Sequence, residues 1–111
     1  MNLLFVCSKN QWRSPTGERI YRDWPGVQTR SAGTSRRARR TVSVADLRWA
    51  DWVLVMERKH QQRLRAQFRE ELRGCRVIVL GIEDHYRCLD PALIERFRAV
   101  VDPLLAEQAG D

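Results

Sequence analysis

The stretch VCSKNQWRSPTGE, residues 6 to 18, decides the predicted fold of this chain. Its first residue ends a continuous apolar run, NLLFV at residues 2 to 6, the pattern of a strand buried on both faces of a parallel sheet. Further on, Ser14 and Pro15 are typical of the N-cap and first position of a helix, which we expect to end before Pro25. The stretch therefore predicts a strand, a polar loop and a helix in direct succession.

The rest of the chain continues this alternation. Further apolar runs predict strands at residues 27–30, 52–56 and 76–80. Helices are expected at residues 43–49 with Ser43 as N-cap, at residues 57–72 before Gly74, and from Asp90-Pro91 onward. This order predicts one α/β domain over residues 1–111, with a four-stranded parallel sheet between two layers of helices. Ligands bind such sheets at the carboxyl ends of the strands, where the loops emerge.

Composition indicates a globular protein with an anionic partner. The 111 residues suit one domain, and 43% hydrophobic and 31% charged residues are ordinary values for such a domain. The net charge is +6, and nearly all basic residues are arginines, which bind phosphate groups through a planar fork. The three cysteines and two histidines lack metal-ligand spacing, so we expect no metal or other cofactor. Without a signal peptide or a run of about 18 apolar residues, the expected location is the cytoplasm, with no membrane partner.

The loop between the first strand and the first helix carries the predicted chemistry. A loop in this position points backbone N–H groups at an anion, and a helix N-terminus together with an arginine stabilises a thiolate. Cys7 is therefore a candidate nucleophile, Arg13 a phosphate clamp and Ser14 a hydrogen-bond donor to the sulfur. The phosphate-binding residues would be Ser8, Lys9, Asn10, Gln11, Trp12, Arg13 and Ser14. The alternative is a buried core cysteine, with Ser14 only an N-cap and Arg13 a solvated charge.

Beyond this loop, the sequence resembles the low-molecular-weight protein tyrosine phosphatases. VCSKNQWRSP is similar to their phosphate-binding loop, and TRSAGTS at residues 29–35 and WADWVLVMERKHQQRL at 49–64 resemble two further segments. The resemblance implies hydrolysis of a phosphate monoester, tyrosine phosphate above all, through a phosphocysteine on Cys7 and without a metal. It also implies that Asn10 fixes the loop backbone and that Ser31 supports Asn10.

The chain also departs from that family's pattern. It is shorter than a typical member, and the segment that helps to line the family's substrate entrance is compressed into RRARRTVSVADLR. Trp12 stands where many members carry a second cysteine in the loop, so Cys7 has no neighbour there for a disulfide. Trp12, Tyr86 and Trp49 are candidate aromatic walls for a substrate.

Two carboxylates compete for the role of general acid. Asp84 follows the fourth strand by a few residues, within chain reach of the phosphate loop. Asp90 precedes Pro91, where an N-cap explains it fully, so we favour Asp84 and keep Asp90 as the alternative acid and Glu83 as a third candidate. His85, in the same loop, is expected to be a solvated residue.

Other functions remain open from the sequence alone. A thioredoxin-coupled arsenate reductase shares this type of loop but needs two further thiols, which would be Cys75 and Cys88. Cys88 could instead protect Cys7 by a disulfide. A nucleic-acid-binding or non-catalytic phosphate-binding module is suggested by residues 35–41, SRRARRT, although such a charge run is usually a solvated surface. The expected partner is a phosphorylated protein or a small phosphate monoester.

Overall fold

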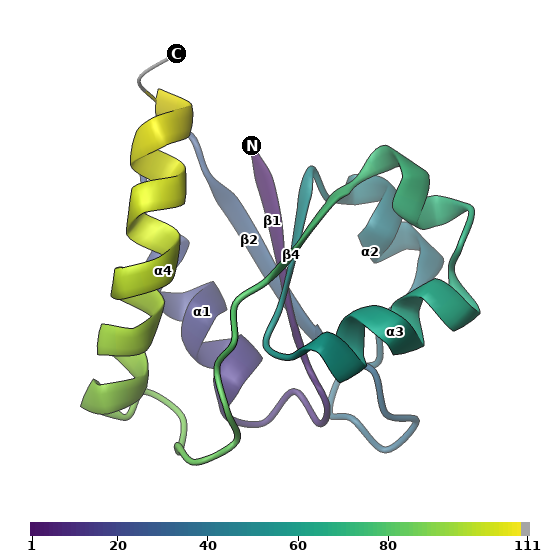
Figure 1. Cartoon of the computed structure of the whole chain (residues 1–111), viewed down its shortest axis with the longest axis horizontal. Helices are drawn as coiled ribbons and strands as arrows, with labels where there is room; N and C mark the ends of the chain where they lie inside the picture. The colour runs from purple at the N-terminus through teal and green to yellow at the C-terminus, as the bar shows by residue number, and fades with distance from the viewer. Residues whose placement is uncertain (110–111) are drawn as a thin grey trace.

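Strand β1 (Asn2–Cys7) lies at the centre of a parallel sheet, as the computed structural model shows for residues 1–109 (Figure 1). It pairs on one side with β2 (Gln28–Gly33) and on the other with β3 (Trp52–Val55), which pairs with β4 (Arg76–Val79). The order is β2-β1-β3-β4, with all neighbours parallel. The predicted four-stranded parallel sheet is confirmed.

Helices cover both faces of the sheet. Figure 1 shows α1 (Arg13–Tyr21) and α4 (Pro91–Ala109) on one side, and α2 (Val44–Trp49) and α3 (Arg58–Gln67) on the other. A short 3-10 helix, η1 (Glu71–Gly74), precedes β4. Each of the first three strands is followed by a crossover on one face or the other, and α4 follows the last strand, which produces the three predicted layers.

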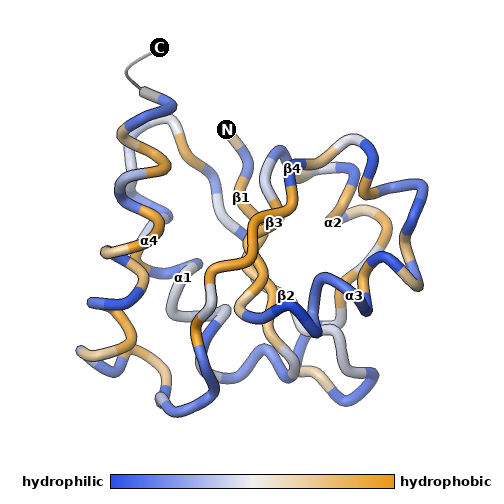
Figure 2. Tube along the Cα trace, viewed as in Figure 1, coloured by the Kyte–Doolittle hydropathy of each residue, from blue (hydrophilic) through white to orange (hydrophobic). Residues whose placement is uncertain are grey.

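The alternation of side chains along β1 supplies both halves of the core. Leu3, Phe5 and Cys7 face α1 and α4, while Leu4 and Val6 face α2 and α3, and all five side chains are buried. Figure 2 shows β1, β3 and β4 as hydrophobic strands in the middle of the molecule, whereas the edge strand β2 is more polar. The core of the chain therefore holds β1 rigidly, and Cys7 at its end is held with it.

Helix α1 approaches β1 closely at Gly17. A Cβ atom on Gly17 would stand 2.5 Å from the ring of Phe5, so any larger residue would push the helix away from the strand. The same ring stacks on Tyr21 at a centroid distance of 5.8 Å, and the Tyr21 hydroxyl donates to Asp102 of α4 at 2.6 Å. Burial, followed by Asp102, raises the pKa of Tyr21 well above its ordinary value, so the phenol remains a donor.

Several predicted boundaries are wrong. The expected helix at residues 57–72 breaks after Gln67, where Phe68 adopts φ −133°, and the chain resumes as η1. This break lets both Phe68 and Leu72 pack on the core beneath α3. Strand β2 is longer than predicted, because it pairs with β1 along its whole length, from Asn2 opposite Gln28 to Cys7 opposite Gly33.

The two predicted N-caps outside the phosphate loop are confirmed. Ser43 Oγ accepts from the backbone N–H of Asp46, whose carboxylate in turn accepts from the N–H of Ser43. Asp90 Oδ1 accepts from the N–H of Ala92 at 2.9 Å, at the start of α4. Within residues 1–109, none of the helices has the length and apolar character needed to cross a membrane.

Candidate active site

The candidate site occupies the carboxyl edge of the sheet, in the loop between β1 and α1. Cys7 is the last residue of β1 and only 3% exposed, and α1 begins at Arg13. The sequence-predicted nucleophile and clamp are thus the two ends of one tight loop. The loop also places the N-terminus of α1 beside the sulfur, which favours a negative charge there.

Ser14 lies within hydrogen-bond distance of the Cys7 sulfur and does not cap helix α1. The predicted N-cap role is wrong, because α1 begins two residues earlier than predicted, at Arg13 after Trp12, and Ser14 lies inside its first turn. Its Oγ is 3.0 Å from Cys7 Sγ and 3.3 Å from the carbonyl oxygen of Ala32. Asn10 Nδ2 donates to the same hydroxyl at 2.9 Å, so the single Ser14 proton is available to the sulfur or to Ala32. A thiolate, being charged, is the stronger acceptor.

Asn10 shapes the middle of the loop from a buried position. Its φ of 56° lies in the left-handed region, which asparagine tolerates better than most residues. The amide Nδ2 donates to Ser14 Oγ and to Ser31 Oγ, both at 2.9 Å, and Ser31 Oγ donates to Glu18 Oε1 at 2.6 Å. Ser31 is supplied by β2, the strand beside β1. The structure brings Asn10, Ser14 and Ser31 into one network.

The outer side of the loop is bonded to residues 34–39. The carbonyls of Cys7, Ser8 and Lys9 each accept a backbone N–H at 3.0 Å, and the carbonyl of Asn10 accepts Arg39 Nε at 3.2 Å. The three backbone donors are Thr34, Ser35 and Arg39. Since C=O and N–H point in opposite directions across a trans peptide, these four bonds turn the N–H groups of residues 8 to 11 towards the inside of the loop. Inward N–H groups of this kind form an anion-binding nest.

The four arginines of residues 35–41 are exposed, as predicted for a solvated charge run, but two of them also bond within the protein. Arg39 bonds the phosphate loop, and Arg40 donates to the carbonyl of Ser31 at 2.8 Å and pairs with buried Asp46. Gly33 makes the close packing possible, because a Cβ there would stand 2.5 Å from the carbonyl oxygen of Ser8. Nothing in the arginine spacing signalled these contacts, since they depend on how β2 lies beside β1.

Arg13 is buried and held in place by a carboxylate that the sequence analysis missed. The guanidinium is 3% exposed, and its Nη1 donates to Glu57 Oε1 at 2.5 Å and to the carbonyl of Ile82 at 2.9 Å. Burial raises the pKa of Glu57, but Arg13 more than offsets it, so the pKa lies below its ordinary value and Glu57 is ionised at neutral pH. The position of Glu57, directly after the third strand, was the available signal.

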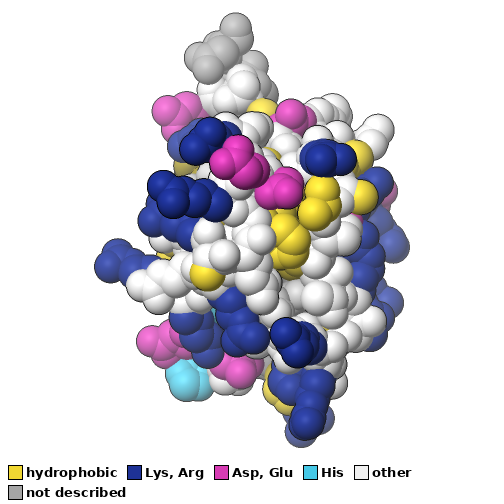
Figure 3. Space-filling model, turned by 90° about the vertical axis from the view of Figure 1, so that its right-hand side faces the viewer, with side chains coloured by type: hydrophobic (Ala, Val, Ile, Leu, Met, Phe, Trp, Pro, Cys, Tyr) yellow, Lys and Arg dark blue, Asp and Glu magenta, His cyan; other side chains and the backbone are white. Residues whose placement is uncertain are grey.

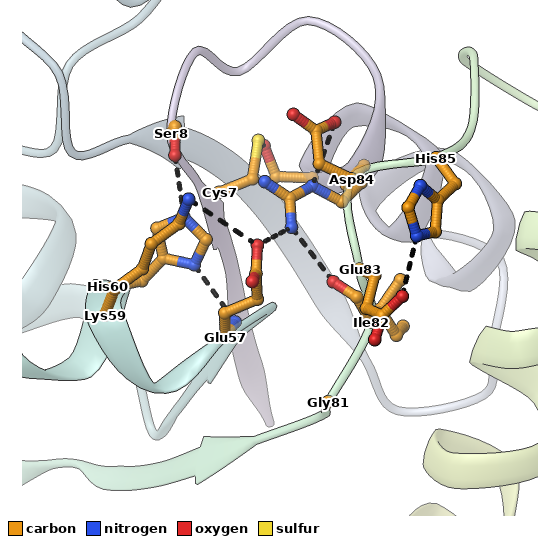
Figure 4. A network of polar contacts seen from close by, with 12 residues as sticks. Cys7, Ser8, Glu57, Lys59, His60, Gly81, Ile82, Glu83, Asp84 and His85 are labelled. Atoms are coloured by element: carbon orange, nitrogen blue, oxygen red, sulfur yellow. Dashed lines mark hydrogen bonds and ion pairs between the residues drawn. The ribbon is translucent and has the colours of Figure 1, made fainter.

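Asp84 and Asp90 lie in different surroundings. Asp84 is 58% exposed, with Oδ1 3.7 Å from Arg13 Nε, whereas Asp90 is engaged in capping α4. Figure 4 shows Asp84 above the site near Cys7, with Glu83 and His85 paired beside it. The Glu83–His85 contact is 2.7 Å long, and both residues are largely exposed. Of the three candidate acids, only Asp84 is thus in contact with Arg13.

The aromatic candidates are not all near the loop. Trp12 is 42% exposed at the start of α1. Tyr86 is partly buried and packs against the half of the core that lies between the sheet and helices α1 and α4. The prediction that Trp49 lines the substrate site is wrong, because its carbonyl accepts from Asn2 at the opposite end of β1. Trp12 and Tyr86 are therefore the two aromatic candidates that are kept.

The other two cysteines lie on opposite sides of the sheet. Cys88 Sγ is 3.8 Å from Thr16 Oγ1 of α1, whereas Cys75 Sγ donates to the carbonyl of Leu47 of α2 at 3.1 Å. Burial raises the pKa of the Cys75 thiol and makes it a poor nucleophile. None of the three cysteines forms a disulfide within the described residues. Among residues 1–109, no cluster of three His, Cys, Asp or Glu side chains could hold a metal ion.

Comparison with solved structures identifies the fold. A low-molecular-weight protein tyrosine phosphatase from T. tengcongensis is 22% identical, with a TM-score of 0.74 over 96% of this chain and 99% of that chain. The YwlE arginine phosphatase from Geobacillus stearothermophilus is 19% identical, with a TM-score of 0.72 over 98% and 96%. The tyrosine phosphatase Wzb from Escherichia coli K30, in complex with sulphate, is 25% identical, with a TM-score of 0.71 over 97% of both chains. No protein-family model and no curated protein matches the sequence.

Proposed function

We propose that this chain, which has the fold of the low-molecular-weight phosphatases along its whole length, hydrolyses phosphate monoesters through a phosphocysteine on Cys7. The observation that best supports the proposal is the outward bonding of four consecutive loop carbonyls around the buried sulfur. It leaves inward N–H groups for three phosphate oxygens, while Arg13 adds a charged donor. Asn10 and Ser31 support this arrangement.

The first step transfers the phosphoryl group to sulfur. The Cys7 thiolate attacks phosphorus, the bond between phosphorus and the bridging oxygen breaks, and a proton from Asp84 goes to the leaving oxygen. The loop N–H groups and Arg13 stabilise the charge on the equatorial oxygens. Asp84 lies beside Arg13, at the exposed rim where a leaving group would depart.

The second step releases phosphate. Asp84, now a carboxylate, takes a proton from water as the water oxygen attacks phosphorus, and the sulfur–phosphorus bond breaks. The departing thiolate is stabilised by the Ser14 hydroxyl, whose oxygen is 3.0 Å from the sulfur. The products are inorganic phosphate and the free enzyme, and the step needs no redox partner.

Arsenate reduction and nucleic-acid binding receive no comparable support. Cys88 contacts α1 and Cys75 contacts α2, on opposite sides of the sheet, whereas a thiol relay needs both close to Cys7. Lys and Arg side chains are spread over the face that carries α2 and α3 (Figure 3), but Arg39 and Arg40 are bonded within the protein. We therefore keep a phosphorylated protein or a small phosphate monoester as the partner.

Tyrosine phosphate is the substrate class that we propose. Trp12 is exposed beside the loop, and its indole could stack on a phenolic leaving group. The test compares turnover of para-nitrophenyl phosphate, a phosphotyrosyl peptide and a phosphoarginyl peptide by the wild-type protein in EDTA. We expect the phosphotyrosyl peptide to have at least about tenfold higher kcat/KM than the phosphoarginyl peptide. A reversed order would assign arginine phosphate, and no turnover of any substrate would contradict the proposed activity.

The general acid is tested by replacing each aspartate with asparagine. Asp84→Asn is expected to lower kcat for para-nitrophenyl phosphate at least about tenfold more than Asp90→Asn, because only Asp84 contacts Arg13. Asp90→Asn should instead lower the melting temperature slightly, since asparagine is itself a good N-cap. Steady-state rates and thermal melts of both variants decide the matter. A larger rate loss in Asp90→Asn would move the acid to Asp90.

A further inference from the structure

The site contains a buried histidine for which the proposed chemistry has no use. His60 belongs to the first turn of α3 and is only 1% exposed. Its Nε2 is 2.8 Å from Ser8 Oγ, and its Nδ1 accepts the backbone N–H of Glu57 at 3.0 Å. Figure 4 shows the ring between Ser8 and Glu57, close to Cys7. The sequence analysis assigned His60 no role.

The contacts of His60 determine which ring nitrogen carries the proton. A backbone N–H can only donate, so Nδ1 must be an unprotonated acceptor, and the proton of the neutral ring lies on Nε2. His60 therefore donates to Ser8 Oγ. Burial, and then the charge of Arg13, lower the pKa of His60 to about 4, although Glu57 and Asp84 raise it and Lys59 lowers it further. The ring is neutral at physiological pH.

Together these bonds connect the first and last residues of the phosphate loop. Ser8 binds His60, the backbone of Glu57 binds the same ring, and the side chain of Glu57 binds Arg13. The start of α3 thus contacts both ends of the loop, across sequence separations of 52 and 44 residues. The carbonyl of Ser8 is bonded on the other side to Ser35 at 3.0 Å. Residue 8 is consequently held by both its side chain and its backbone.

We infer that His60 is a positioning residue, which holds Ser8 so that the first peptide groups of the loop face the phosphoryl group. The inference rests on the proposed phosphatase function, because it assigns His60 a part in binding the phosphoryl group. His60 does not touch the substrate. It acts through Ser8. Glu57 links His60 to Arg13, because its backbone N–H bonds the imidazole and its carboxylate bonds the guanidinium.

Ser8→Ala, His60→Asn and the double variant test the inference. Asparagine at position 60 can still accept the Glu57 N–H, as an N3 residue of a capping box, but is too short to reach Ser8. Calorimetric titration with inorganic phosphate at pH 7 is expected to show about five- to tenfold weaker binding in each single variant, the loss of about one hydrogen bond. The double variant should bind no more weakly than the weaker single variant. His85→Asn, which removes an exposed imidazole, is the matched control and should bind phosphate normally.

Two outcomes of the titration would overturn the inference. Unchanged phosphate affinity in both single variants would show that the contact does not position the loop. Losses that multiply in the double variant would show that Ser8 and His60 act independently. Ser8→Ala removes a single oxygen atom, so it keeps the test decisive should His60→Asn fold poorly.

A second readout uses the ligand-free protein and separates this inference from the proposed activity. Nitrogen-15 NMR of the imidazole should place the proton of His60 on Nε2 at pH 7, and a proton on Nδ1 would contradict the inference. The unfolded chain, with an ordinary histidine pKa near 6.5, binds the proton more readily than the folded one, so wild-type stability should fall as the pH is lowered from about 6.5 to 4. His60→Asn should show a smaller fall in melting temperature over that range. A wild type without turnover would refute the activity while leaving these measurements valid.

Discussion

Cys7→Ser is expected to abolish the hydrolysis of para-nitrophenyl phosphate in the presence of EDTA, with a loss of at least about a thousandfold in kcat. A serine hydroxyl fits the space of the thiol but does not ionise at neutral pH, so neither Ser14 nor the helix N-terminus has an anion to stabilise. The loop N–H groups and Arg13 are unchanged by the substitution. The variant should therefore still bind inorganic phosphate.

The matched control for this variant is Cys88→Ser, the same replacement on the loop after β4. Cys88 contacts Thr16 through a long 3.8 Å interaction, so its loss is expected to change kcat less than about twofold. Stopped assays of both purified variants, with thermal melts to verify folding, give the comparison. Substantial hydrolysis by folded Cys7→Ser would exclude Cys7 as the nucleophile. Equal losses in both variants would show that the effect is not specific to Cys7.

Arg13→Lys is expected to lower kcat/KM for the same substrate by about 100- to 1000-fold. Lysine keeps the positive charge but lacks the planar fork, and one ammonium cannot bind Glu57, the Ile82 carbonyl and a phosphate at the positions that the guanidinium reaches. Most of the loss should be in kcat, because Arg13 stabilises charge that spreads over the transition state.

Arg63→Lys provides the control for this exchange, since Arg63 is exposed on α3. It should retain kcat/KM within about twofold. A fall of less than about threefold in Arg13→Lys would show that a point charge suffices at this position and that the bidentate contact is unnecessary. A loss confined to KM would indicate that Arg13 binds the substrate and its transition state equally.

Local sequence was sufficient for much of the site. Cys7 and Arg13 could be paired from sequence because a single loop joins them, and the strand before it and the helix after it have strong local patterns. Asp90 could be recognised as a cap because Pro91 follows it, and this favoured Asp84 as the acid. The N-cap prediction for Ser14 failed by two residues of helix boundary, whereas the other role predicted for Ser14, a hydrogen bond to sulfur, fits the 3.0 Å distance between its Oγ and Cys7 Sγ.

The sequence by itself determined the strands, most of the helices and the loop that would bind an anion, since these depend on hydrophobic periodicity and on neighbouring residues. Only the tertiary structure decided what holds that loop: Arg39 on one side, and Glu57 and His60 on the other. Those contacts join segments separated by tens of residues. They arise because parallel pairing of β1 with β2 and β3 brings the loops after all three strands to one edge of the sheet, and no local pattern records that pairing.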